Sequence, residues 1–134
     1  MSKRILATCI ALFISFAMFG QISNYSEKEI SDYIQSLIGG EREVSVKSGR
    51  IDLVHNDVAF EIDWANKWKE SIGQALWYAQ QSNKKPGIIL ILKKESDYKY
   101  FLQLNSSLIY ANLNEEFQVY LFPNDFEKFI DKNK

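Results

Sequence analysis

The sequence predicts an α/β fold in which a mixed sheet is flanked by helices, and three observations support this prediction. Stretches with helical spacing alternate with short strand patterns. The uninterrupted apolar run at residues 88–92 suits a strand that is covered on both faces. Tightly joined strands come first and should pair antiparallel, whereas the later strands follow helical crossovers, which favour parallel pairing.

We expect the N-terminal segment to lie outside this domain. Lys3 and Arg4 precede an apolar run at residues 5–19, which is typical of a secretory signal peptide. The run is shorter than the roughly 20 residues that a membrane-spanning helix needs. We therefore expect residues 1–20 to be a signal peptide and residues 21–134 to be a single domain. That domain would be exported to the periplasm or the extracellular space, with no stable membrane association after cleavage. An N-terminal membrane anchor is the alternative.

Loss of the signal peptide changes the composition of the remaining domain. Cys9, the only cysteine of the chain, is lost with it. The domain then has no disulfide and no thiolate metal ligand. The net charge falls from −1 to about −3 because Lys3 and Arg4 are removed. This charge argues against a broad surface that coats nucleic acid, but it allows a local basic groove.

Local signals place the first elements along the chain. The stretch from Ser26 to Glu29 has the pattern of a capping box, so a helix should begin there and end at Gly39. Asn56 and Asp57 are a turn signal between two apolar segments, which predicts a hairpin. The expected elements after the first helix are a strand at 43–47, hairpin arms at 50–55 and 58–63, a helix at 65–82, a strand at 88–92, a helix at 97–112, a strand at 117–122 and a short helix at 125–131.

The hairpin places two acidic side chains opposite one another. If Asn56 and Asp57 form a two-residue loop, Asp52 faces Glu61 on the next strand. Like charges at paired positions destabilise a sheet, so we expect a cation between them. Strand alternation puts Asp63 on the same face as Glu61. Oxygen ligands of this kind suit Mg²⁺ or Mn²⁺.

The helix that follows supplies a candidate cation. Lys67 and Gln74 are seven residues apart, so they differ by roughly 20° around the helix axis, and Tyr78 continues the same stripe. We expect Lys67 to lean towards the carboxylates, where it would orient a water molecule or stabilise charge on a phosphate. Gln74 and Tyr78 would hold the substrate or Lys67. The neighbouring apolar stripe that should face the sheet consists of Trp68, Ile72, Ala75, Leu76 and Ala79.

These residues resemble the PD-(D/E)XK nuclease superfamily. The resemblance is closest in GRIDLVHNDVAFEIDWANKWKESIGQALWYA at residues 49–79, within a helix–strand–strand–strand–helix–strand order that matches the core of the restriction-endonuclease-like fold. The later helix, strand and helix would be a C-terminal α-β-α extension. The resemblance implies that Asp52 and Glu61 are metal ligands, together with the backbone carbonyl of Ile62. Gln74 and Tyr78 resemble the Gln-x-x-x-Tyr element of one branch.

The chain departs from the superfamily motif at one position. Asp63 stands where the motif has a lysine, and Lys67 suits the branches in which that lysine moves to the following helix. Some members also use a glutamate from the first helix or just after it. Glu43 is the candidate for that role, with Glu29 and Glu41 as alternatives.

The resemblance implies a Mg²⁺- or Mn²⁺-dependent nuclease that hydrolyses phosphodiester bonds, with DNA favoured over RNA as substrate. The expected catalytic residues are Asp52, Glu61, Lys67 and Gln74, and the possible supporting residues are Glu43, Asp63 and Tyr78. The alternative is a catalytically inactive binding or scaffold module of the cell envelope that keeps the nuclease fold. Asp63 in the lysine position and the negative charge favour this alternative. The sequence leaves the oligomeric state open.

Overall fold

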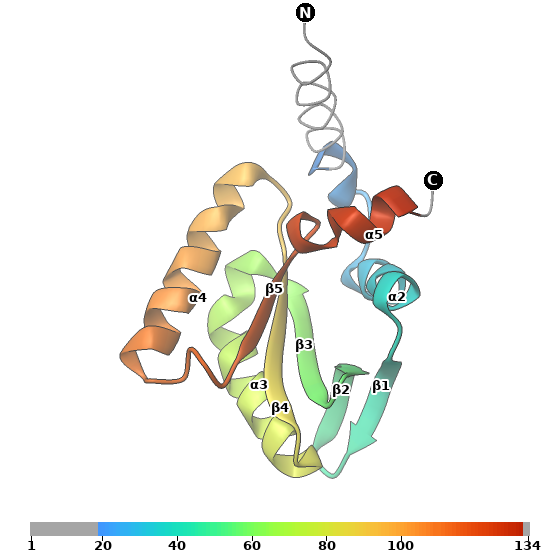
Figure 1. Cartoon of the computed structure of the whole chain (residues 1–134). Helices are drawn as coiled ribbons and strands as arrows, with labels where there is room; N and C mark the ends of the chain where they lie inside the picture. Colours follow the sequence, from blue (N-terminus) through green and yellow to red (C-terminus); the bar gives the residue numbers. More distant parts are fainter. Residues whose placement is uncertain (1–18, 133–134) are drawn as a thin grey trace, which may run out of the picture.

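A five-stranded mixed sheet with helices packed against it forms the fold, as the sequence predicts (Figure 1). This computed structural model describes residues 19–132. The strands lie in the order β1-β2-β3-β4-β5, and β1, β2 and β3 are antiparallel neighbours. The pairs β3–β4 and β4–β5 are parallel, because helical crossovers join these strands. The strands are β1 (Glu41–Val46), β2 (Gly49–His55), β3 (Val58–Trp64), β4 (Lys85–Ile91) and β5 (Gln118–Phe122).

The helices lie where the sequence predicts them, to within a few residues. The Ser26 hydroxyl accepts from the Glu29 N–H, and the Glu29 carboxylate accepts from the Ser26 N–H, so the predicted capping box is confirmed. Gly39 ends this helix with φ +83°. The helices are α2 (Glu27–Ile38), α3 (Trp68–Ser82), α4 (Tyr98–Tyr110) and α5 (Glu127–Lys132), with single 3₁₀ turns η1 (Ala65–Lys67), η2 (Glu95–Asp97) and η3 (Asn124–Phe126).

The β2–β3 hairpin has the predicted register. Asn56 and Asp57 both have positive φ, +47° and +63°, which is the conformation of a two-residue type I′ turn. Three cross-strand pairs follow the turn, from His55 opposite Val58 to Leu53 opposite Phe60. The registered pairs of this ladder end before Asp52 and Glu61, so these two residues lie just beyond the regular part of the hairpin.

Strand β4 begins earlier than expected. The sequence suggests that Pro86 and Gly87 belong to the connection before the strand, but both lie within β4. A side chain at Gly87 would place its Cβ 2.5 Å from Phe60 Cδ1 and 2.6 Å from Val58 Cγ1. Glycine is therefore compatible with the strand here because it lets the neighbouring side chains of β3 pack over the backbone.

The apolar residues of α4 divide between buried and exposed positions. Tyr98, Leu102 and Ile109 are largely exposed. The buried residues of α4 are Leu104 and Leu108. The helix carries two apolar stripes, so periodicity alone does not decide which of them packs on the sheet.

The apolar face of α3 is predicted more accurately. Trp68, Ala75 and Ala79 are buried as expected, whereas Leu76 is exposed. Ser71 is fully buried, and its hydroxyl is satisfied there because it donates to the Lys67 carbonyl at 3.1 Å. The buried face of α3 is thus centred closer to Ser71 than the pattern of apolar residues indicates.

Most of the predicted signal peptide lies outside the described residues. Residues 19–22 are helical, and Phe19 and Ile22 are buried within the main hydrophobic core. Phe19, at the end of the predicted signal peptide, therefore packs with the domain. Within residues 19–132, no helix is long and apolar enough to cross a membrane. Export, and the alternative of an N-terminal anchor, remain predictions.

We expect Gly87→Ala to lower the free energy of unfolding by about 1–3 kcal/mol, because the new methyl group overlaps Phe60 and Val58. Urea denaturation measures this change. Gly73→Ala, on the exposed side of α3, is the matched control. No atom lies within 4 Å of the position that its new methyl group would occupy, and alanine favours a helix. Equal stabilities of the two variants would contradict the proposed reason for glycine in β4.

Candidate functional site

Four acidic side chains gather at the carboxyl end of β3. Glu61 and Asp63 lie two residues apart on this strand, and each is only 8% exposed. Asp52 reaches Glu61 from β2, and Glu27 reaches Asp63 from the first turn of α2. We call Glu27, Asp52, Glu61 and Asp63 the carboxylate cluster. Three elements that are separate in sequence therefore build this cluster.

Asp52 is held against β3 by its side chain. Its Oδ2 accepts a hydrogen bond from the Ile62 N–H at 2.9 Å. In the neighbouring ladder, pairs are registered at Arg42 with Leu53 and at Val44 with Ile51, but not between them at Glu43 and Asp52. Glu43 has φ +54°, which interrupts regular strand geometry. The Asp52 carboxylate thus stands where both ladders depart from regular pairing.

Glu61 is the most perturbed member of the carboxylate cluster. Burial raises its pKa to about 9, with further contributions from the negative charges of Asp52, Asp63 and Glu27. Its Oε2 is buried and has no hydrogen-bond partner. A buried acceptor without a partner is costly, so this oxygen is free to accept a cation or a donor. Without one, Glu61 is a neutral acid at pH 7.

Glu27 belongs to the cluster although the sequence did not single it out. Burial raises its pKa to about 7, and the nearby Asp63 carboxyl adds to this effect, while the charge of Lys67 opposes it. Acidic residues are common in the first turn of a helix because they complement the helix dipole. The position of Glu27 in the sequence therefore did not indicate a role in a site. The available signal was the superfamily's use of a glutamate from its first helix.

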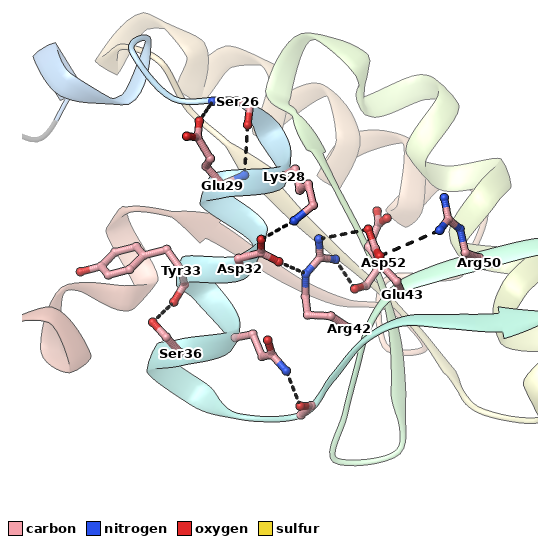
Figure 2. A network of polar contacts seen from close by, with 12 residues as sticks. Ser26, Lys28, Glu29, Asp32, Tyr33, Ser36, Arg42, Glu43, Arg50 and Asp52 are labelled. Carbon is pink, nitrogen blue, oxygen red and sulfur yellow. Dashed lines mark hydrogen bonds and ion pairs between the residues drawn. The ribbon is translucent and has the colours of Figure 1, made fainter.

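The other glutamates considered for that role have different contacts, and Figure 2 shows those of Glu29 and Glu43. Glu29 completes the capping box of α2. Glu43 lies between two arginines, with its Oε1 4.0 Å from Arg42 Nη2 and its Oε2 3.9 Å from Arg50 Nη1. Glu41 is exposed at the start of β1, where it pairs with Val54.

Lys67 is the cation that the structure places at the cluster. Its Nζ lies 3.7 Å from Asp63 Oδ1, and its side chain is 52% exposed. It belongs to η1, one residue before α3 begins, so its direction is not set by the α-helical stripe used in the prediction. Asp63 also accepts a hydrogen bond from the Trp64 N–H at 2.8 Å.

No hydrogen bond or ion pair described in the structure joins Gln74 or Tyr78 to the carboxylate cluster. Gln74 is exposed on α3. Tyr78 packs against Gly49 and lies beside a small hydrophobic cluster that contains Ile51 and Ala79.

The donor chemistry of the cluster fits a divalent cation, although the arrangement is not a ready-made ligand set. Across residues 19–132, no three His, Cys, Asp or Glu side chains are grouped as a metal site. The unpartnered oxygen of Glu61 and the adjacent Asp52 carboxylate nevertheless supply the hard oxygen donors that Mg²⁺ and Mn²⁺ prefer.

Comparisons with known proteins find partial similarity to two proteins of Acanthamoeba polyphaga mimivirus. KilA-N domain-containing protein L33 is 49% identical over 53 residues, which are 40% of this chain and 22% of that protein. KilA-N domain-containing protein L32 is 38% identical over 58 residues, which are 43% of this chain and 16% of that protein. The matches thus span about a fifth of each relative. No family profile and no solved structure matches the chain.

We expect Glu61→Gln to stabilise the metal-free protein at alkaline pH. The pKa of Glu61 is raised from 4.5 to about 9 in the folded state, so its contribution to stability is full below about pH 4.5 and is lost as the pH rises through about 9. The amide cannot ionise, so the variant should gain stability over wild type steadily as the pH rises from 5 to 9, by up to several kcal/mol, because each pKa unit corresponds to about 1.4 kcal/mol.

Urea denaturation in chelator between pH 5 and 9 measures this difference. Glu115→Gln, which removes an exposed carboxylate, is the control and should follow wild type. A Glu61→Gln curve parallel to that of wild type would show that Glu61 does not carry an excess proton in the folded state.

Proposed function

We propose that this protein is a Mg²⁺- or Mn²⁺-dependent phosphodiesterase that cleaves nucleic acid, with DNA favoured over RNA. The observation that carries the proposal is the buried, unpartnered Glu61 oxygen beside the Asp52 carboxyl at the end of β3. The order of elements from α2 to β4, helix–strand–strand–strand–helix–strand, is the one that the PD-(D/E)XK resemblance implies. The names of the viral relatives belong to much longer proteins and do not bear on this reaction.

Asp52, Glu61 and the backbone carbonyl of Ile62 would hold the divalent cation. When bound, the ion would polarise a phosphodiester and lower the pKa of its bound water. Asp52 is already fixed in direction by the Ile62 N–H. Glu61 must give up its proton to become a ligand, so metal affinity should rise with pH.

Lys67 would supply the positive charge that the superfamily motif places on the strand itself. Asp63 occupies that motif position and holds the Lys67 ammonium at 3.7 Å instead. Because half of the Lys67 side chain is exposed, its ammonium can reach a phosphate bound at the cluster. Glu27, with a pKa of about 7, is suited to accept a proton near neutral pH. Gln74 and Tyr78 have no part in this proposal.

The alternative function is a nuclease-fold module that binds nucleic acid or protein without cleaving it. Asp63 in the place of the motif lysine favours it, since Asp63 adds negative charge where the motif has positive charge. The two functions differ in metal binding, because an inactive module has no need to retain a cation site.

We expect millimolar Mn²⁺ to raise the melting temperature of the wild-type protein and to leave Asp52→Ala and Glu61→Ala unchanged. At metal concentrations 100-fold above Kd, binding to the folded state contributes about 2.7 kcal/mol, which is a shift of several degrees. Differential scanning fluorimetry with Mn²⁺ or chelator measures the shift. Glu115→Gln should respond as wild type does. A wild-type protein whose melting temperature ignores Mn²⁺ would exclude the metal site and favour the inactive module.

We expect Lys67→Ala to lower cleavage by about 100-fold or more while Mn²⁺ still raises the melting temperature, because a charge that acts on the transition state is lost and the ligands remain. Cleavage of single-stranded and duplex DNA and RNA is measured with Mn²⁺ and with chelator. Lys69→Ala is the control, since Lys69 extends over the Trp68 ring. Normal cleavage by Lys67→Ala would rule out the relocated lysine.

A further inference from the structure

We infer that Arg42 is a positioning residue that holds Asp52 in place and ties it to α2. This inference rests on the proposed function in one respect only, namely that Asp52 is a metal ligand. The evidence is a continuous path of contacts from α2 through β1 to β2, which runs from Asp32 to Arg42 to Asp52 (Figure 2).

Asp52 needs such support because the regular sheet does not supply it. Registered pairs flank Asp52 in the β1–β2 ladder but do not include it, and those of the β2–β3 ladder end at Leu53. The Asp52 carbonyl oxygen instead accepts a hydrogen bond from Arg42 Nη1. A side-chain donor thus serves the backbone at the position where the neighbouring residue, Glu43, has left strand geometry.

Arg42 is itself held from the helix side. Its Nε donates to Asp32 Oδ1 at 3.1 Å, and its side chain is only 11% exposed. The guanidinium is a rigid planar fork, so two contacts on different edges fix its orientation. Lys28 donates to the other oxygen of Asp32 at 2.7 Å, which holds that carboxylate in turn.

The same path affects a second member of the carboxylate cluster. Asp32 and Glu27 lie on α2, about one and a half turns apart. The contact between Asp32 and Arg42 therefore fixes α2 against β1 close to the turn from which Glu27 reaches Asp63. One arginine thus controls the placement of Asp52 directly and of Glu27 through the helix.

Arg42 is poorly suited to bind substrate directly. Its side chain is nearly buried and both described hydrogen bonds are internal. Arg50, on the adjacent strand, is 66% exposed and approaches only Glu43, at 3.9 Å, among the described residues. The two arginines contact the same glutamate but differ in burial and in contact with Asp52, so Arg50 is a matched control.

The first test needs no metal. The Ile62 N–H donates to the Asp52 carboxylate, so its hydrogen-exchange rate reports the position of Asp52. We expect Arg42→Gln to speed exchange at Ile62 at least about tenfold relative to Ile89, its registered neighbour on β4, while Arg50→Gln leaves the ratio unchanged. If Arg42→Gln does not fold, Arg42→Lys is measured and should show a smaller increase. An unchanged ratio in the folded Arg42 variant would overturn the inference.

The second test measures Mn²⁺ affinity by titration calorimetry. Arg42→Gln and Asp32→Asn should each weaken Mn²⁺ binding by about 10-fold or more. The double variant should bind Mn²⁺ with the same affinity as the single variant that has the lower affinity, because both substitutions act through one path. Arg50→Gln should stay within about twofold of wild type. A folded Arg42→Gln that binds Mn²⁺ as wild type does would overturn the inference. A wild-type protein that does not bind Mn²⁺ would refute the proposed function, and the exchange test would still decide the role of Arg42.

Discussion

Repulsion among buried carboxyl groups is the constraint around which this end of the molecule is built. Glu61 and Asp63 are nearly buried, and Asp52 and Glu27 bring two more acidic groups to the same strand end. Burial and mutual repulsion raise the pKa values of Glu27, Asp52 and Glu61, so the metal-free cluster keeps protons that isolated carboxyls would lose. A fold selected only for stability would replace one of these acids, and their presence together supports a function that uses the charge.

The surrounding structure limits this repulsion without removing it. The Ile62 N–H and the Arg42 guanidinium both favour the ionised form of Asp52, which partly opposes the effect of its burial. On the other side, Lys67 opposes the rise in the pKa of Glu27. Asp52 thus has donors and a positive charge that favour its ionised form, whereas nothing comparable lowers the pKa of Glu61, whose Oε2 has no hydrogen-bond partner. The cluster therefore combines one carboxyl held by donors with one that lacks a donor.

Sequence reasoning predicted those features that local chemistry determines. The capping box at Ser26 and the turn at Asn56–Asp57 depend on a few adjacent residues, and the α/β class follows from the order of helices and strands. It did not predict that Ser71 is buried and Leu76 exposed on α3, because the packing of a helix on a sheet depends on contacts that are distant in sequence. It also passed over Glu27, whose role arises only when α2 docks beside the end of β3.

Asp63 stands where the resemblance to the PD-(D/E)XK superfamily implies a lysine, and the proposed chemistry is compatible with this difference. A lysine on β3 would place its ammonium directly among the carboxyls. With aspartate there, the Asp63 carboxylate accepts from the Trp64 N–H and attracts Lys67 from the turn that follows. The ammonium thus stays within 3.7 Å of the strand end, but on a half-exposed side chain that can move with a bound phosphate. The exchange adds one negative charge to the cluster, and this added charge raises the pKa of Glu61 further. A site of this kind would gain more from a bound divalent cation than one with the lysine on the strand, because more repulsion is relieved when the cation binds.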